Sequence, residues 1–173
     1  MKLQIRLNVI SVFVWDFYFM DDLAIARAIH VISVIAWIGG VYLVTFVVLP
    51  SVRVMDEALD QIRSFDEIES RFGGHAKIMT LIAGGSGFYM LYKMDAWSRY
   101  TSLDYWWIHA MTAIWVLFTV VLFVLEPLFL HAWFDKRAQE APVETFAMVA
   151  RFHQILLVAS LITVFGAVLG VHG

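Results

Sequence analysis

The sequence predicts an all-α integral membrane protein, a four-helix up-down bundle preceded by an amphipathic N-terminal segment, residues 1–22. Of the 173 residues, 61% are hydrophobic and only 16% are charged, whereas an ordinary soluble domain is about half apolar and about a quarter charged. The apolar residues gather in four long runs, and the charged residues lie in the gaps between them. These runs do not alternate with the period of a strand, so helices are the expected way to satisfy their backbones in lipid.

Each run approaches the length that a membrane crossing requires. A helix needs about 20 apolar residues to cross a hydrocarbon core about 30 Å thick. The first run carries no charge between His30 and Pro50, and the third carries none between Tyr105 and Glu126. The predicted helices are residues 23–50, 75–94, 105–131 and 152–171, which together form one domain, residues 23–173.

The connecting segments are charged. Residues 51–74 have apolar positions at helical spacing, so we expect an amphipathic surface helix or a pair of turns that ends at Gly73 and Gly74. Residues 132–150 are predicted to form a solvated link with Pro142 inside it. Lys and Arg are slightly more numerous in these two longer loops, which favours a cytoplasmic position for them. The expected location is a bacterial inner (cytoplasmic) membrane, crossed several times.

Five of the six histidines lie at or within the predicted spans, where an ionisable side chain is costly and indicates a function. His30 lies about two turns into the first helix, and His109 about one turn into the third, which enters from the same side. We therefore expect these two at similar depth. His75, His131 and His153 are expected to share a level near the opposite surface.

These positions predict haem ligation. In an up-down bundle the first and third helices are diagonal, so His30 pairs naturally with His109, and His75 with His153 or His131. Haem iron accepts imidazoles from two opposite sides, so one or two haem b groups are expected. For His75, His131 and His153, a solvated interfacial histidine is the alternative.

Other residues in the spans allow two interpretations. Arg27, one turn from His30 on the same face, is placed to pair with a haem propionate or to reach the lipid head groups. The glycines within the helices either make room for a flat macrocycle or let helices pack closely: Gly39, Gly40, Gly84, Gly85, Gly87, Gly166 and Gly170.

Glu126 and Pro127 are unusual inside a span. Pro127 is expected to bend or locally open the third helix. Glu126 is interpreted as protonated, as paired with a basic loop residue, as part of a proton path, or as a carboxylate that reaches back to the interface.

The absence of cysteine excludes several kinds of site, namely disulfides, iron–sulfur clusters, thiolate-bound zinc and thioether-attached haem. Copper is the alternative metal. Copper(I) prefers soft ligands, and Met90, Met94 and Met111 are the methionines expected to approach one another near one surface.

Two motif regions resemble known families. The stretch HVISVIAWIGGVYLVTFVVLPSVR, from His30 to Arg53, and the stretch RFGGHAKIMTLIAGGSGFYMLY, residues 71–92, are similar to the first two helices of the membrane domain of copper-resistance protein D. This resemblance covers most of the chain and implies a helical membrane domain with a role in copper transport or resistance.

A weaker similarity is to the small HemJ-type protoporphyrinogen oxidases, which bind haem b. Their first-helix histidine precedes a W-x-x-G stretch, as His30 precedes Trp37 and Gly40. Their W-x-H-x-K motif resembles the stretch around His109, but Met111 stands in place of the lysine. The similarity implies haem b held by His30 and His109, and the departure at Met111 argues against the oxidase activity.

We thus expect a haem-b-binding membrane protein, a cytochrome that exchanges electrons with a redox partner protein or a quinone. Copper transport is the first alternative. The others are an oxidase-like protein and a non-catalytic anchor, either a homo-oligomer or a subunit of a larger complex.

Overall fold

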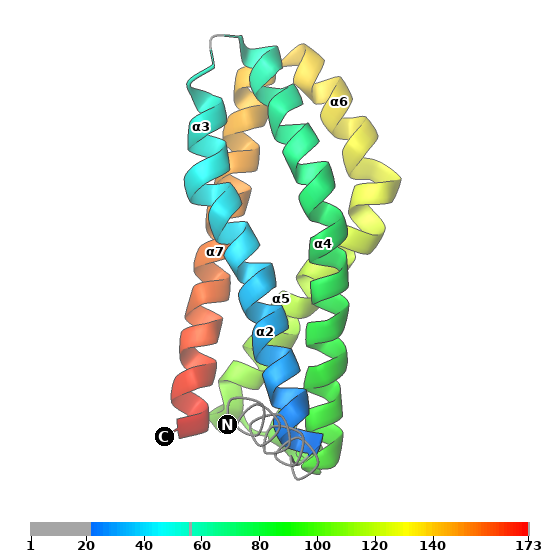
Figure 1. Ribbon diagram of the computed structural model, residues 1–173, viewed down its shortest axis with the longest axis vertical. Helices are drawn as coiled ribbons and strands as arrows, with labels where there is room; N and C mark the ends of the chain where they lie inside the picture. The colour runs from blue at the N-terminus through cyan, green and yellow to red at the C-terminus, as the bar shows by residue number, and fades with distance from the viewer. Residues whose placement is uncertain (1–21, 56, 173) are drawn as a thin grey trace, which may run out of the picture.

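The described chain is helical throughout its regular structure. The computed structural model describes residues 22–55 and 57–172, and all regular structure in these two stretches is helical (Figure 1). The all-α prediction is confirmed for this part of the chain. The predicted N-terminal segment, residues 1–22, lies outside the described residues except for Asp22.

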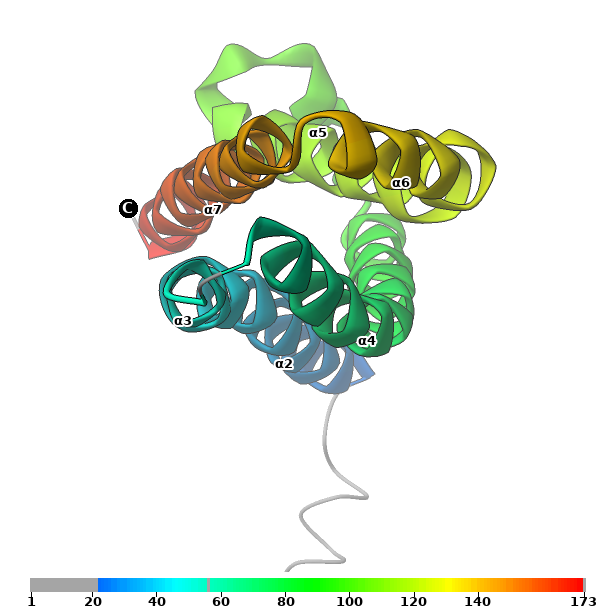
Figure 2. The same ribbon diagram turned by 90° about the horizontal axis from the view of Figure 1, so that it is seen from above.

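Successive helical rods run in opposite directions along the long axis (Figure 1). Viewed from above, α2 and α4 form one layer, and α5, α6 and α7 form the other (Figure 2). We call the end with the α3–α4 and α6–α7 turns the upper end, and the other the lower end. The elements in chain order are α2 (Asp22–Leu43), the π-helical segment η1 (Val44–Val48), α3 (Leu49–Arg53), α4 (Ala58–Lys93), the 3-10 turns η2 (Trp97–Thr101) and η3 (Leu103–Tyr105), α5 (Trp106–Val120), the π-helical segment η4 (Val121–Leu130), α6 (His131–Glu140) and α7 (Pro142–His172).

All three prolines lie where a helix tolerates a missing amide proton. Pro50 lies in the first turn of α3, directly after the π-helical segment η1. Pro127 lies inside the π-helical segment η4. A π turn is wider than an α turn, so it accommodates the proline ring and the lost hydrogen bond. Pro142 opens α7, where no partner for an amide proton is needed. The prediction that Pro127 opens the third helix locally is confirmed.

Two predicted helix boundaries are wrong. α4 continues through Gly73 and Gly74, where the prediction ended a separate surface helix. Each glycine costs a helix about 1 kcal/mol relative to alanine, and packing against a neighbouring helix offsets that cost. Residues 132–150 are not a solvated link, because α6 extends the third rod to Glu140 and α7 begins at Pro142.

The lower end of α4 has a defined turn. Asp95 adopts a left-handed φ of 49°, and its amide donates to the carbonyl of Tyr92. The amide of Ala96 donates to the carbonyl of Leu91. This is the Schellman pattern, which satisfies the last carbonyls of the helix and reverses the chain.

The core lies between the two layers. Trp37 of α2 meets Phe118 of α5 edge to face, with ring centroids 4.7 Å apart. Ala83 of α4 and Leu157 of α7 complete this central cluster. A second cluster at the upper end joins η1, α3, α4 and α7; its buried members are Val44, Leu49, Val52, Phe65 and Phe146.

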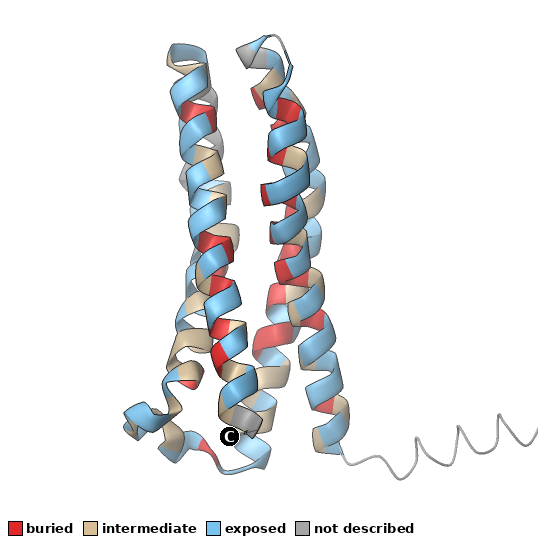
Figure 3. Cartoon of the chain, turned by 90° about the vertical axis from the view of Figure 1, so that its left-hand side faces the viewer, coloured by how far each residue is buried: buried red, intermediate tan, exposed pale blue. Residues whose placement is uncertain are grey.

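Large apolar side chains cover much of the outer surface, which Figure 3 draws as exposed. Ile32, Ile155 and Phe165 are 65%, 67% and 67% exposed, and a soluble protein rarely shows so much apolar surface. Within the described residues, three helical stretches are long and apolar enough to cross a membrane: Asp22–Arg53, Leu103–Leu128 and Pro142–Gly170. These observations are consistent with an integral membrane protein. α4 is longer but less apolar, because its charges continue to Lys77 and its apolar half holds three glycines.

Candidate functional site

His30 lies on α2, half-buried, and its ring faces α4. Its Nδ1 lies 2.9 Å from the carbonyl oxygen of Ala83 and 3.2 Å from Oγ of Ser86. A carbonyl oxygen only accepts, so this contact assigns the ring proton to Nδ1 and leaves a lone pair on Nε2. Gly87 makes the approach feasible, since a Cβ there would lie 3.3 Å from Cε1 of His30. The hydrogen bond through Nδ1 fixes the orientation of the ring.

His109 lies at the lower end of α5 and faces a different element. Its Nε2 donates to the carbonyl oxygen of Ser102 at 3.3 Å, which leaves the lone pair on Nδ1. The ring of Tyr100 meets the imidazole edge to face, with centroids 5.4 Å apart. His30 therefore packs against α4, whereas His109 packs against the connection before α5. The predicted pair is not brought into contact with each other.

The histidines predicted near the upper surface are also separated. His75 is exposed on α4. His153 has only 14% of its side chain accessible and lies 3.9 Å, through Nε2, from Oε1 of Glu69. The two histidines therefore have different surroundings, one open and one enclosed. His131 begins α6, and its side chain lies outside what the structure describes.

An apolar groove of about 490 Å³ runs between α2 and α4 beside His30. Ala26, Ile29, Ser86 and Tyr89 are among the residues that line it. Ser86 thus contacts both the groove and the ring of His30. Arg27 is exposed on α2, one turn from His30.

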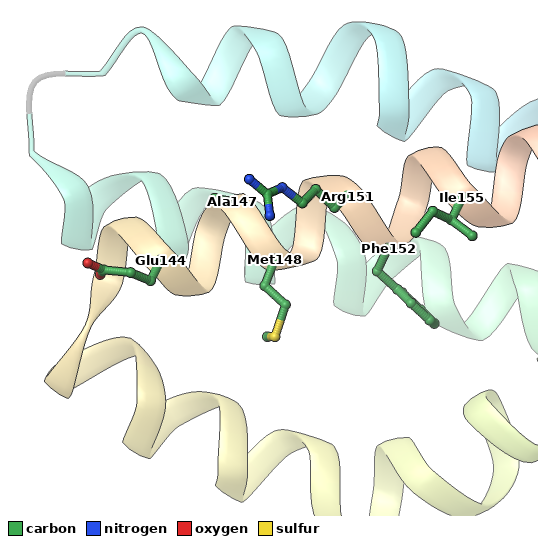
Figure 4. Close-up of a pocket in the computed structure, with 6 residues that line it drawn as sticks. All are labelled: Glu144, Ala147, Met148, Arg151, Phe152 and Ile155. Atoms are coloured by element: carbon green, nitrogen blue, oxygen red, sulfur yellow. The ribbon is translucent and has the colours of Figure 1, made fainter.

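A second open groove, of about 430 Å³, lies along the upper half of α7 (Figure 4). None of the residues predicted to bind a ligand lines it. The lining side chains are Glu144, Ala147, Met148, Arg151, Phe152 and Ile155.

Several glycines of the spans receive aromatic rings from neighbouring helices. A Cβ at Gly84 would lie 2.4 Å from the ring of Trp115, and one at Gly40 would lie 2.0 Å from the ring of Phe72. Gly166 and Gly170 face Trp106 and Trp107 in the same way, and a Cβ at each would lie 2.1 Å and 2.4 Å from the ring, respectively. Of the two sequence interpretations, close packing explains these four positions.

Lysines of α4 form ion pairs with neighbouring rods. Lys77 contacts both carboxylate oxygens of Glu126 at 3.1 Å, and these side chains are 31% and 40% accessible. Glu126 therefore has a basic partner, as one of the sequence interpretations had it, but Lys77 lies within α4 and not in a loop. At the lower end, Lys93 and the hydroxyl of Tyr89 contact Asp22 at 2.5 Å and 2.9 Å. The sequence analysis missed this pair, because charges far apart in sequence meet only through the packing of α2 on α4.

Glu69 is the other acidic residue with a notable environment. Burial beside α7, and then the carboxylates of Asp66 and Glu126, raise the pKa of Glu69 to about 7. Its side chain is nevertheless 47% accessible, so water screens part of this effect. The carboxyl of Glu69 therefore binds its proton more tightly than an ordinary glutamate does.

Compared with family models, curated proteins and solved structures, the chain matches none of them. The resemblances to copper-resistance protein D and to HemJ-type proteins therefore stay predictions.

Proposed function

We propose that α2, α4, the α5–η4 rod and α7 all cross the lipid as a four-helix up-down bundle. α4 lies alongside α2 from the Gly40–Phe72 contact to the Asp22–Lys93 pair. If α2 crosses the hydrocarbon, α4 occupies the same depth beside it. Its charged upper third then extends beyond the lipid, because its 36 residues span about 54 Å.

A single lipid boundary at the upper end is compatible with the lengths of α4, the α5–η4 rod and α7. About 20 residues of helix cross the hydrocarbon. Counted from the lower ends, this brings α4 to about Gly73, η4 to about Pro127 and α7 to about Ala150. A Cβ at Gly73 would lie 3.8 Å from Oε1 of Glu126, which supports a common level for two of these positions.

Accessibility of single cysteines tests the crossing of α4, since the chain has no cysteine of its own. Val54→Cys lies at the upper end and Ser98→Cys at the lower end, both exposed. In sealed spheroplasts, a membrane-impermeant maleimide is expected to label only one of the two, and both after lysis. Labelling of both, or of neither, before lysis contradicts four crossings.

The proposed activity is that of a b-type cytochrome, in which Nε2 of His30 would hold haem b. The observation that carries this proposal is the bond from Nδ1–H of His30 to the carbonyl of Ala83, which fixes the ring and leaves Nε2 free. When bound, haem b supplies a one-electron couple that a quinone or a partner protein can use. Ser86 and Ala83 orient the imidazole, and Arg27 lies on the same face for a propionate.

His109 is the proposed second ligand, because the sequence predicts a similar depth in the membrane for His109 and His30. The lone pair on Nδ1 of His109 is free. For this ring to face His30, the hydrogen bond from Nε2 to the carbonyl of Ser102 has to break or change its direction. A haem held by His30 alone is therefore the other form of the proposal.

Absorption spectra of protein purified from a haem-replete host test this proposal. The reduced protein is expected to show the α-band of low-spin haem b, and His30→Ala is expected to lose nearly all bound haem. His75→Ala is the matched control, because that residue is exposed. His109→Ala is expected to remove the low-spin band while His30 keeps haem bound. A colourless wild-type protein contradicts the proposal, and bound copper in its place favours the copper alternative.

A further inference from the structure

Two buried polar atoms at the centre of the bundle have no hydrogen-bond partner among the described residues: Nε1 of Trp37 on α2 and Oγ1 of Thr80 on α4. Trp37 is 4% exposed and Thr80 is 0% exposed. The indole N–H only donates, whereas the hydroxyl both donates and accepts. A buried polar group without a partner is costly, and more so in lipid, where bulk water does not reach it. Both atoms therefore indicate a small polar ligand in the core.

The hydroxyl of Thr80 differs in its bonding from those of other threonines in the rods. Thr45, Thr119 and Thr163 each donate to the carbonyl oxygen four residues earlier, at 2.7 Å, 2.8 Å and 2.8 Å. Thr80 makes no such bond to the carbonyl of Ala76. A helical threonine divides between two rotamers, because its hydroxyl reaches the preceding turn in only one of them. Oγ1 of Thr80 is therefore available to a group outside its own helix.

The register of α2 on α4 brings the two side chains toward each other. His30 contacts the carbonyl of Ala83 at 2.9 Å, which aligns the two antiparallel helices at that level. Trp37 lies seven residues above His30, and Thr80 lies three residues above Ala83, so Trp37 is about one turn higher. Side chains lean toward the N-terminus of their own helix. The indole of Trp37 therefore leans down toward Thr80, whose side chain leans up.

The neighbouring α5 rod contacts both residues at this level. The ring of Trp37 lies with its centroid 4.7 Å from that of Phe118. One turn before Phe118, Nε1 of Trp115 donates to the carbonyl oxygen of Thr80 at 2.9 Å. The same stretch of α5 thus packs against Trp37 and against Thr80. The two unpartnered atoms belong to one region of the core.

Ser33 supplies a third polar atom in this region. It lies one turn before Trp37 on α2, and it is 2% exposed. Its hydroxyl donates to the carbonyl oxygen of His30 at 2.8 Å, so lone pairs of its Oγ remain to accept. A donor, an acceptor and a group that does both therefore lie around one point between α2 and α4. A buried water typically makes about three hydrogen bonds, which is the number that these groups offer.

We propose that one water molecule is bound between α2 and α4, where it accepts from Nε1 of Trp37, donates to Oγ of Ser33 and bonds to Oγ1 of Thr80. Small buried side chains flank Thr80 one turn to either side, Ala76 and Ala83, and they make room for a molecule of this size. The water satisfies both unpartnered atoms and joins the two rods inside the lipid. This site goes beyond the proposed cytochrome function and does not depend on haem.

Thr80→Val tests the bound water through the sign of the change in stability. Valine has nearly the shape of threonine, so the change removes the hydroxyl and leaves the water with one partner fewer. Removal of a hydroxyl that bonds to nothing would instead raise the melting temperature. Thr163→Val is the matched control, because Thr163 is also buried and its hydroxyl bonds within its own helix. In mild detergent, Thr80→Val is expected to melt at least about 2 °C below Thr163→Val. An equal or higher melting temperature overturns the proposal.

Nuclear magnetic resonance of protein with isotope-labelled tryptophan, in detergent micelles, detects the water directly. The Hε1 proton of Trp37, assigned by its loss in Trp37→Phe, is expected to show a nuclear Overhauser effect to water. This cross peak is expected to persist in Thr80→Ala, because Trp37 and Ser33 still hold the water. Absence of the cross peak in the wild type overturns the proposal. Its loss in Thr80→Ala does so too, because the indole then contacts the hydroxyl itself. These outcomes are independent of the haem spectra.

Discussion

Gly84→Ala is expected to lower the stability of the protein by about 1–3 kcal/mol, because the added methyl group overlaps a fixed aromatic ring. The new Cβ would lie 2.4 Å from Cε2 and Nε1 of Trp115. That ring has little freedom to move, since Nε1 donates to the carbonyl of Thr80 at 2.9 Å and Phe88 packs against it edge to face. Relief of the overlap requires a shift that weakens both contacts. The higher helical preference of alanine offsets at most about 1 kcal/mol of this loss of stability.

Gly85→Ala is the matched control for this prediction. No atom lies within 4 Å of a Cβ built at Gly85, although it is the next residue in the same helix. The substitution is expected to leave stability unchanged or slightly raised, because alanine favours the helix. Thermal unfolding in mild detergent, followed by circular dichroism, measures both variants. Equal melting temperatures for the two would contradict the packing of Trp115 against Gly84.

Removal of Lys77 is expected to cost about 1–3 kcal/mol of stability, because it leaves the carboxylate of Glu126 without its cation inside the bundle. A fully buried pair loses about 3–5 kcal/mol in this way, and partial accessibility of both side chains reduces the effect here. Lys77→Met and Glu126→Gln are each expected to lower the melting temperature. The double variant is expected to lose less than the sum of the two, since neither charge is then left alone.

A double-mutant cycle of Arg71→Met and Glu67→Gln is the comparison for the Lys77–Glu126 pair. Those two residues form a pair on the same helix at 2.9 Å, with side chains 79% and 70% accessible. An exposed pair contributes about 0–1 kcal/mol, so its coupling energy is expected to be the smaller of the two. Additive effects of Lys77→Met and Glu126→Gln would mean that this contact does not stabilise the bundle.

Local patterns in the sequence predicted the helices well and their ends less well. Long apolar runs have no alternative to a helix in lipid, so the four helical regions followed from composition and length. The opening of the helix at Pro127 also followed, because a proline lacks the amide proton wherever it stands. The end predicted at Gly73 and Gly74 failed, because packing of α4 against α2 outweighs the weak helical preference of glycine.

The candidate site divides in the same way. The sequence predicted the positions of His30 and His109 along their helices, but it did not predict the groups that each ring contacts. Ala83 and Ser86 for His30, and Ser102 for His109, come from segments far away or from a turn whose course only the fold defines.

The sequence by itself determined that residues 22–55 and 57–172 are helical in their regular structure, that the apolar runs suit a membrane, and that ionisable groups lie inside them. These properties depend on residue type and on neighbours a few positions away. Only the tertiary structure decided that Lys77 pairs with Glu126, that Glu69 faces His153, and that glycines of the spans hold aromatic rings. Such contacts depend on the rotation and offset of each helix against the next. Packing of the whole bundle sets these quantities, and no local pattern encodes them.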